Sequence, residues 1–119
     1  MNTNTSTHSK LYIDRKKVAI NYSDIVYLEG DENYTIIYLS NGKKVLCART
    51  LKDITNHIQS GEFCRIHRSY CINLNHIRNY KRSDQEVEMT NGHRFGVARR
   101  KKTLFEKQVS DFWNLDESH

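Results

Sequence analysis

Residues 34–48 read YTIIYLSNGKKVLCA and carry the clearest signal for the fold. β-branched and aromatic side chains fill positions 34–39, the pair Asn41-Gly42 follows, and a second apolar run covers positions 44–48. Because both residues of an Asn-Gly pair tolerate a positive φ, the pattern predicts a β-hairpin closed by a type I′ turn.

The same order of residues returns later in the chain. Val87 and Met89 alternate with glutamates, Asn91-Gly92 follows, and another strand-like run begins at His93. Such alternation is typical of a strand with one buried face. Further strands are expected at 11–13, 17–20, 25–28 and 69–73.

Two helices are predicted beside these strands. The first covers about residues 51–60, with Thr50 as its N-cap and Asp53 three residues later. Gly61 stands where a glycine commonly ends a helix.

The second helix begins near Arg99 or Arg100 and ends near Trp113. Four apolar side chains share one of its faces, with Leu104 adjacent: Phe105, Val109, Phe112 and Trp113. Strands outnumber helices and short loops join them. The expected fold is therefore mainly β (α+β), with antiparallel sheets and two flanking helices.

The chain has 119 residues, which suits a single domain. We expect a polar tail or linker remnant at 1–10, the domain at 11–115 and a frayed C-terminus at 116–119. Three cysteines lie at irregular spacing without a metal-ligand pattern: Cys47, Cys64 and Cys71. Buried thiols in a reduced, cytoplasmic compartment are expected, with no metal and no cofactor. No run suits a membrane span or a signal peptide.

Positive charge is concentrated in one part of the chain. Residues 65–102 contain ten Lys and Arg and three acidic residues, a net charge of +7, whereas the remainder contains nine basic and eleven acidic residues. A basic half on a nearly neutral protein is the footprint of a polyanion-binding surface. The plain alternative is a solvated basic face.

The run Arg99-Arg100-Lys101-Lys102 stands at the predicted start of the second helix. Cations there oppose the helix dipole, and each costs about 0.3–1 kcal/mol at most when exposed. These cations run against the usual preference for acidic residues at a helix start, which points to a functional site. Basic side chains and helix N-terminal amides together suit phosphate groups. A tolerated, solvent-facing turn is the alternative interpretation.

Residues 65–69 read as a polar turn between two strand-like pieces. Arg68 suits guanine recognition through its two-pronged guanidinium, and Ser69 suits a phosphate contact. For His67, a buried structural role is favoured over base reading.

The acidic loop 29–34 is a weaker candidate. Asn33 in this loop suits adenine, although Asn is also a common turn residue. Enzyme signatures are missing: Ser69, His67 and Asp84 do not follow a known triad pattern, and no glycine-rich phosphate loop occurs. We therefore expect neither an enzyme nor a small-molecule substrate.

The order of these segments resembles the LytTR DNA-binding domain of bacterial response regulators over about residues 11–110. The most specific part is Phe63-x-x-Ile-His-Arg-Ser-Tyr-x-Ile-Asn-Leu with the following Ile77. Matching segments also occur at 25–29, 33–34, 41–42, 49–51, 91–92 and 97–100. The resemblance implies an elongated fold of antiparallel sheets with flanking helices, loops in major grooves, and bent DNA that carries two domains on direct repeats.

By motif position, the resemblance assigns base contacts to Asn33, Arg68 and Arg99. It assigns phosphate contacts to Tyr34, Ser69, Asn73, Arg100 and Lys102. His67 is implied to brace the Arg68 loop. Ala98 stands where the family often has Ser, which removes one possible hydroxyl contact.

The implied function is sequence-specific double-stranded DNA binding for bacterial transcription regulation in a two-component system. The implied partners are a second copy on DNA and a sensor kinase, receiver domain or membrane regulator. The chain is either a free-standing LytTR protein or an excised output domain. Two other functions stay open: a protein-interaction or inhibitory module with weak DNA binding, and single-stranded RNA binding through stacking on Tyr34, Tyr38 and Tyr70.

Overall fold

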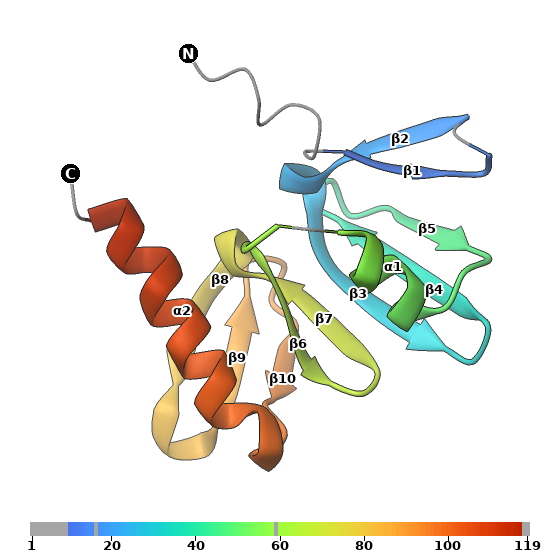
Figure 1. Ribbon diagram of the computed structural model, residues 1–119. Coiled ribbons are helices and arrows are strands. Elements are labelled where there is room, and N and C mark those ends of the chain that lie inside the picture. The colour runs from blue at the N-terminus through green and yellow to red at the C-terminus, as the bar shows by residue number, and fades with distance from the viewer. Residues whose placement is uncertain (1–9, 16, 59, 118–119) are drawn as a thin grey trace.

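The computed structural model describes residues 10–15, 17–58 and 60–117 (Figure 1). Its strands are β1 (Lys10–Ile13), β2 (Val18–Asn21), β3 (Ile25–Asp31), β4 (Tyr34–Leu39), β5 (Lys44–Cys47), β6 (Phe63–His67), β7 (Tyr70–Asn73), β8 (Ile77–Lys81), β9 (Glu86–Met89) and β10 (Arg94–Gly96). The α-helices are α1 (Leu51–His57) and α2 (Lys102–Glu117), and short 3-10 helices are η2 (Tyr22–Asp24), η3 (Leu74–His76), η4 (Arg82–Asp84) and η5 (Arg99–Lys101).

The predicted tail and frayed end fall mostly outside this description, since residues 1–9 and 118–119 are not among the described ones. Lys10 already belongs to β1, and α2 continues through Glu117. The folded part therefore extends slightly beyond both predicted domain boundaries.

The strands form three antiparallel sheets. The central sheet has the order β5-β4-β3-β7-β6, β1 pairs with β2, and a third sheet has the order β10-β9-β8. This confirms the predicted mainly antiparallel β fold with two helices. The body measures 42 × 39 × 25 Å, so it is flat with two long dimensions rather than drawn out along one.

The strand β8 was not predicted. Among its five residues only Ile77 and Tyr80 are apolar or aromatic, which is too little for a local pattern. Its pairing with β9, in which Tyr80 lies opposite Val87, supplies the missing stabilisation. Only the tertiary partner therefore makes this segment a strand.

Both Asn-Gly hairpins form, but the predicted type I′ turn is wrong. Of the two Asn-Gly pairs, only the glycines have positive φ, 89° at Gly42 and 91° at Gly92. Leu39 donates its N–H to Lys43 O (2.9 Å), and Gly42 donates to Leu39 O (3.0 Å), which leaves a three-residue loop that ends in a left-handed glycine. The second hairpin has the same two hydrogen bonds: Met89 donates its N–H to His93 O (2.8 Å), and Gly92 donates to Met89 O (2.9 Å).

The central sheet separates two hydrophobic cores, as the arrangement in Figure 1 shows. One core lies beneath α1 and the β1–β2 hairpin, and the other lies between the sheet, β8–β10 and α2. Neighbouring residues of β3 divide between them: Leu28 belongs to the first core and Tyr27 to the second. Side chains that alternate along a strand therefore serve both faces.

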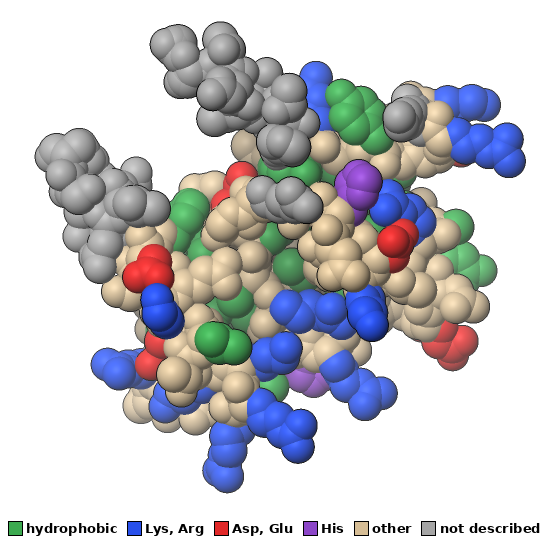
Figure 2. Space-filling view, in the orientation of Figure 1, with side chains coloured by type: hydrophobic (Ala, Val, Ile, Leu, Met, Phe, Trp, Pro, Cys, Tyr) green, Lys and Arg blue, Asp and Glu red, His purple; other side chains and the backbone are tan. Residues whose placement is uncertain are grey.

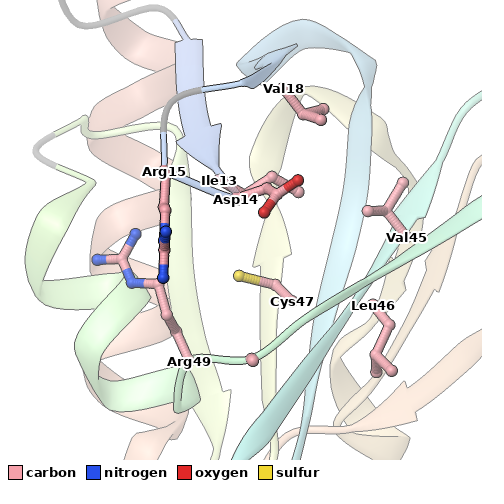
Figure 3. Close-up of a pocket in the computed structure, with 9 residues that line it drawn as sticks. Ile13, Asp14, Arg15, Val18, Val45, Leu46, Cys47 and Arg49 are labelled. Atoms are coloured by element: carbon pink, nitrogen blue, oxygen red, sulfur yellow. The ribbon is translucent and has the colours of Figure 1, made fainter.

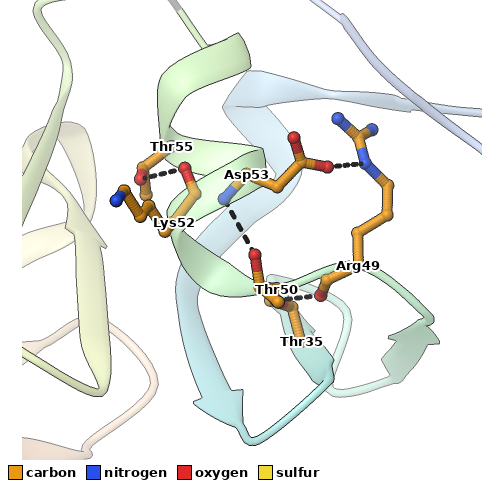
Figure 4. Close-up of polar contacts among 6 residues, drawn as sticks. All are labelled: Thr35, Arg49, Thr50, Lys52, Asp53 and Thr55. Atoms are coloured by element: carbon orange, nitrogen blue, oxygen red, sulfur yellow. Dashed lines mark hydrogen bonds and ion pairs between the residues drawn. The ribbon is translucent and has the colours of Figure 1, made fainter.

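The N-cap prediction for α1 is confirmed (Figure 4). Thr50 Oγ1 accepts a hydrogen bond from the Asp53 N–H (3.1 Å), and Arg49 Nε donates to the Asp53 carboxylate (2.7 Å). The predicted end is wrong, because α1 stops at His57 and the next residue, Ile58, is already extended. Gly61 consequently does not cap this helix.

Gly30 in β3 lies close to Leu51, the first residue of α1. A Cβ at Gly30 would lie 2.9 Å from Leu51 Cβ, so a side chain there would push the helix away. The need for glycine here arises from a contact between distant segments, because Gly30 does not have a positive φ.

The second helix begins later and ends later than predicted. Arg99–Lys101 form the 3-10 turn η5, and regular α-helix starts at Lys102. Phe105 and Val109 are buried in the second core and Phe112 packs against it, whereas Leu104 and Trp113 are exposed.

The three cysteines are free and buried, which agrees with the expectation of buried thiols. Burial raises the pKa of Cys64 to about 11 and that of Cys71 to about 12.

Candidate nucleic-acid interface

The turn between β6 and β7 is held in place by four polar contacts. Arg65 Nε donates to His67 O (3.1 Å), and its guanidinium also donates to Arg68 O. The Ser69 N–H donates to His67 Nδ1 (3.1 Å), while the Gly30 N–H of β3 donates to Ser69 O (2.8 Å). The main chain of the turn is thereby fixed, and the exposed Arg68 side chain extends from a rigid base.

His67, which the resemblance implies to brace the Arg68 loop, contacts the main chain of this turn. Its Nδ1 accepts the Ser69 N–H, so the imidazole is oriented by the main chain of the turn. The ring also lies 5.7 Å from that of Tyr70, measured between centroids. It is half-buried, so it supports the turn from within rather than extending toward a ligand.

Arg65 was missed as a functional residue, since the sequence placed it within the polar turn. It belongs instead to β6, and its guanidinium donates to the carbonyls of His67 and Arg68. Nothing in the local pattern distinguishes an arginine that holds the main chain of a turn from one that contacts DNA, because the difference lies in the conformation of the following turn.

The basic turn η5 lies against the same strand. The Ala98 N–H donates to Ile66 O (3.2 Å), which attaches the start of η5 to β6. Arg99 and Arg100 are exposed, and Lys102 is half-buried. Figure 2 shows many Lys and Arg side chains over this part of the molecule. The predicted cations at positions 68, 99 and 100 therefore come from neighbouring segments.

Asn33 and Tyr34 are exposed at the hairpin between β3 and β4. Asp31 pairs with Tyr34, so Glu32 and Asn33 form a two-residue loop in which Glu32 has a φ of 56°. In Figure 1 the tips of the β3–β4 and β6–β7 hairpins and η5 all lie along the lower border of the molecule.

Asn73 is a correction to the predicted site. Its side chain is 0% exposed and donates to Tyr22 O (3.1 Å) and Ile25 O (2.9 Å). Its Oδ1 accepts from the Asn75 N–H (2.9 Å). All its polar atoms are thus used inside the protein, and the predicted phosphate contact is wrong.

Two of the three tyrosines that suggested RNA stacking are engaged internally. Tyr38 stacks on Tyr27, with 4.2 Å between ring centroids, and donates to Glu29 Oε1 (2.8 Å). Tyr70 packs against Phe95, with centroids 4.7 Å apart. Desolvation, followed by the Glu29 charge, raises the pKa of Tyr27 to about 12. This aromatic cluster joins the central sheet to β10, so Tyr38 and Tyr70 are already packed against protein rings.

Among the described residues, no set of three His, Cys, Asp or Glu side chains is placed to hold a metal ion. In the same part of the chain, no helix is long and apolar enough to cross a membrane.

The chain is similar in sequence to two transcriptional regulators. The CO-responsive transcriptional regulator RcoM of Rhodospirillum rubrum is 26% identical over 65 residues, which cover 55% of this chain and 27% of RcoM. The transcriptional regulatory protein YpdB of Escherichia coli K12 is 31% identical over 65 residues, covering 55% of this chain and 26% of YpdB. The chain thus spans about a quarter of the length of either relative.

A solved LytTr DNA-binding domain from Bacillus cereus has the same fold, with a TM-score of 0.72 and 22% sequence identity. The match covers 85% of this chain and 96% of that domain. The family model of the LytTr DNA-binding domain matches residues 15–110. The chain therefore belongs to the LytTR family of DNA-binding domains.

Proposed function

We propose that this chain binds duplex DNA sequence-specifically to regulate transcription, and that it reads major grooves through loops rather than through a recognition helix. The observation that carries the proposal is the rigid β6–β7 turn, which presents Arg68 next to the basic turn η5. A base-reading side chain needs a fixed attachment, because one bidentate pair contributes about 1–3 kcal/mol of discrimination only when its geometry is correct.

In this proposal Arg68, Arg99 and Asn33 contact bases. Tyr34, Ser69, Arg100 and Lys102 contact phosphates and position the domain without reading sequence. Exposure supports most of these roles, since only Ser69 and Lys102 are half-buried and the others are exposed. His67 and Arg65 hold the turn.

We further propose that two copies occupy direct repeats about one helical turn apart, so that both present their loops to the same side of the duplex. Bending of the DNA would bring flanking phosphates toward Arg100 and Lys102. The energy that the bend costs is offset by these additional contacts. The upstream signal would reach the domain through a sensor kinase, receiver domain or membrane regulator.

The test is selection of bound duplexes from a random DNA pool at two salt concentrations. The expected result is an enriched motif repeated at about one helical turn, with affinity that falls as salt rises. Binding without an enriched motif that disappears at the higher salt would contradict the proposal, because charge attraction alone would then explain the interaction.

A further inference from the structure

A second surface lies at the opposite edge of the central sheet from β6. In the order β5-β4-β3-β7-β6, strand β5 is an edge strand that pairs with β4 alone among the described residues. A cavity of about 540 Å³ lies between β5 and the tip of the β1–β2 hairpin (Figure 3). All five consecutive residues 45–49 line it. Because successive side chains of a strand point to opposite faces, such continuous lining places the cavity along the backbone edge.

The register shows which backbone groups face this cavity. Leu39 and Lys43 form a hydrogen-bonded pair at the hairpin, so the next hydrogen-bonded pairs toward α1 place Val45 opposite Ile37 and Cys47 opposite Thr35. The N–H and C=O groups of Lys44 and Leu46 therefore point away from β4. Leu46 is 63% exposed, which leaves this edge uncovered.

The chemistry of the walls combines apolar and cationic groups. Ile13, Val18 and Val45 supply apolar surface, and Arg15 and Arg49 line the same cavity. Arg49 uses Nε to bind Asp53 (2.7 Å). Among the described residues, the edge and the hairpin tip carry five cations against two acids: Arg15, Lys17, Lys43, Lys44 and Arg49 against Asp14 and Asp53.

We propose that this edge and its cavity bind an extended acidic segment of a partner protein, which adds a strand beside β5. Its backbone would pair with Lys44 and Leu46, an apolar side chain would enter the cavity, and acidic side chains would face Arg15 and Arg49. A second copy of this chain fits poorly, because two such edges would bring like charges together. DNA fits poorly too, because the apolar wall offers nothing to phosphates.

The test uses the full chain labelled with ¹⁵N and an eight-residue peptide of alternating Glu and Val, blocked at both ends. We expect the amide resonances of Lys44 and Leu46 to shift and their hydrogen exchange to slow. The amides of Val45 and Cys47, which already bind β4, should keep their exchange rates. A peptide in which Lys replaces every Glu is the matched ligand control.

Two variants sharpen the result. Arg15→Glu should weaken binding of the Glu-Val peptide by about fivefold and strengthen binding of the Lys-Val peptide, whereas the distant Lys81→Glu should change neither. Leu46→Pro removes an outward N–H that β4 does not use, so it should abolish peptide binding while the spectrum of the folded domain persists.

Three outcomes would overturn the proposal: no shifts at Lys44 and Leu46 at millimolar peptide, equal binding of both peptides, or shifts at these amides caused by duplex DNA and not by the acidic peptide. The last would assign the cavity to the DNA interface. Because the selection experiment on DNA is independent of this edge, either proposal can fail while the other holds.

Discussion

The β6–β7 turn and the η5 turn are both basic and exposed, yet their main chains are held very differently. Side chains of Arg65 and His67 and the Gly30 N–H bind the main chain of the first turn directly. The second turn begins at Ala98, whose side chain cannot cap it, and depends on backbone hydrogen bonds from Ala98 and Lys101.

This difference separates two physical demands on a DNA-binding surface. A base contact needs a donor pair held within tenths of an ångström, whereas a phosphate contact needs mainly positive charge at the right distance. We infer that the β6–β7 turn supplies most of the specificity and that η5, apart from the base contact proposed for Arg99, supplies mostly affinity. The following predictions test that division.

Gly30→Ala should have the largest effect, because it disturbs the β3 segment that anchors the β6–β7 turn. The new Cβ would meet Leu51 Cβ at 2.9 Å, and overpacking of this kind lowers the free energy of unfolding by about 1–3 kcal/mol. Urea denaturation measures the change. Gly96→Ala is the matched control, since nothing lies within 4 Å of a Cβ there. Equal stability of the two variants would show that β3 and α1 do not pack closely at Gly30.

Arg68→Ala should weaken binding to the selected duplex by about 1–3 kcal/mol and relax the preference at one base pair, with a smaller change on random duplex. Fluorescence anisotropy with both duplexes measures the effect. Equal losses on the two would remove Arg68 from the base-reading residues.

Arg65→Met keeps much of the aliphatic stem but loses the donors to the carbonyls of His67 and Arg68. We expect a loss of about 1–2 kcal/mol in specific binding, with the salt dependence nearly unchanged. In a double-mutant cycle with Arg68→Ala the losses should be less than additive, since both act through one side chain. Additive losses with a reduced salt slope would mean that Arg65 contacts phosphate itself.

Lys102→Ala should act alike on all sequences. Loss of one phosphate contact lowers the slope of log affinity against log salt by about 0.9, with no change in the selected motif. Titrations at several salt concentrations measure the slope. A changed motif would show that Lys102, beside η5, also reads sequence, which would break the proposed division.

Ala98→Ser should have the smallest effect and would make the two turns more alike. A hydroxyl at the N-cap of η5 supplies an acceptor for an amide of the first turn, which stabilises by about 0.5–1 kcal/mol. Thermal unfolding measures the gain. If the selected motif also sharpens, the mobility of η5 rather than its charge limits specificity.

Local sequence determined the hairpins, the N-cap of α1, the buried face of α2 and the exposed basic positions, because each depends on neighbours within a few residues. Thr50 and the left-handed glycines at 42 and 92 show this directly. The family resemblance, carried by residues 63–77, also followed from order and spacing alone.

Only the tertiary structure decided the rest. Asn73 looked like a phosphate contact but binds the backbone of residues 22 and 25, about fifty positions away. Arg65 holds the main chain of the β6–β7 turn because the turn places the His67 carbonyl beside its guanidinium. Tyr38 is not free to stack on a base because it stacks on Tyr27 and donates to Glu29. These roles depend on which distant groups meet, and satisfying a buried polar atom is a property of the whole fold.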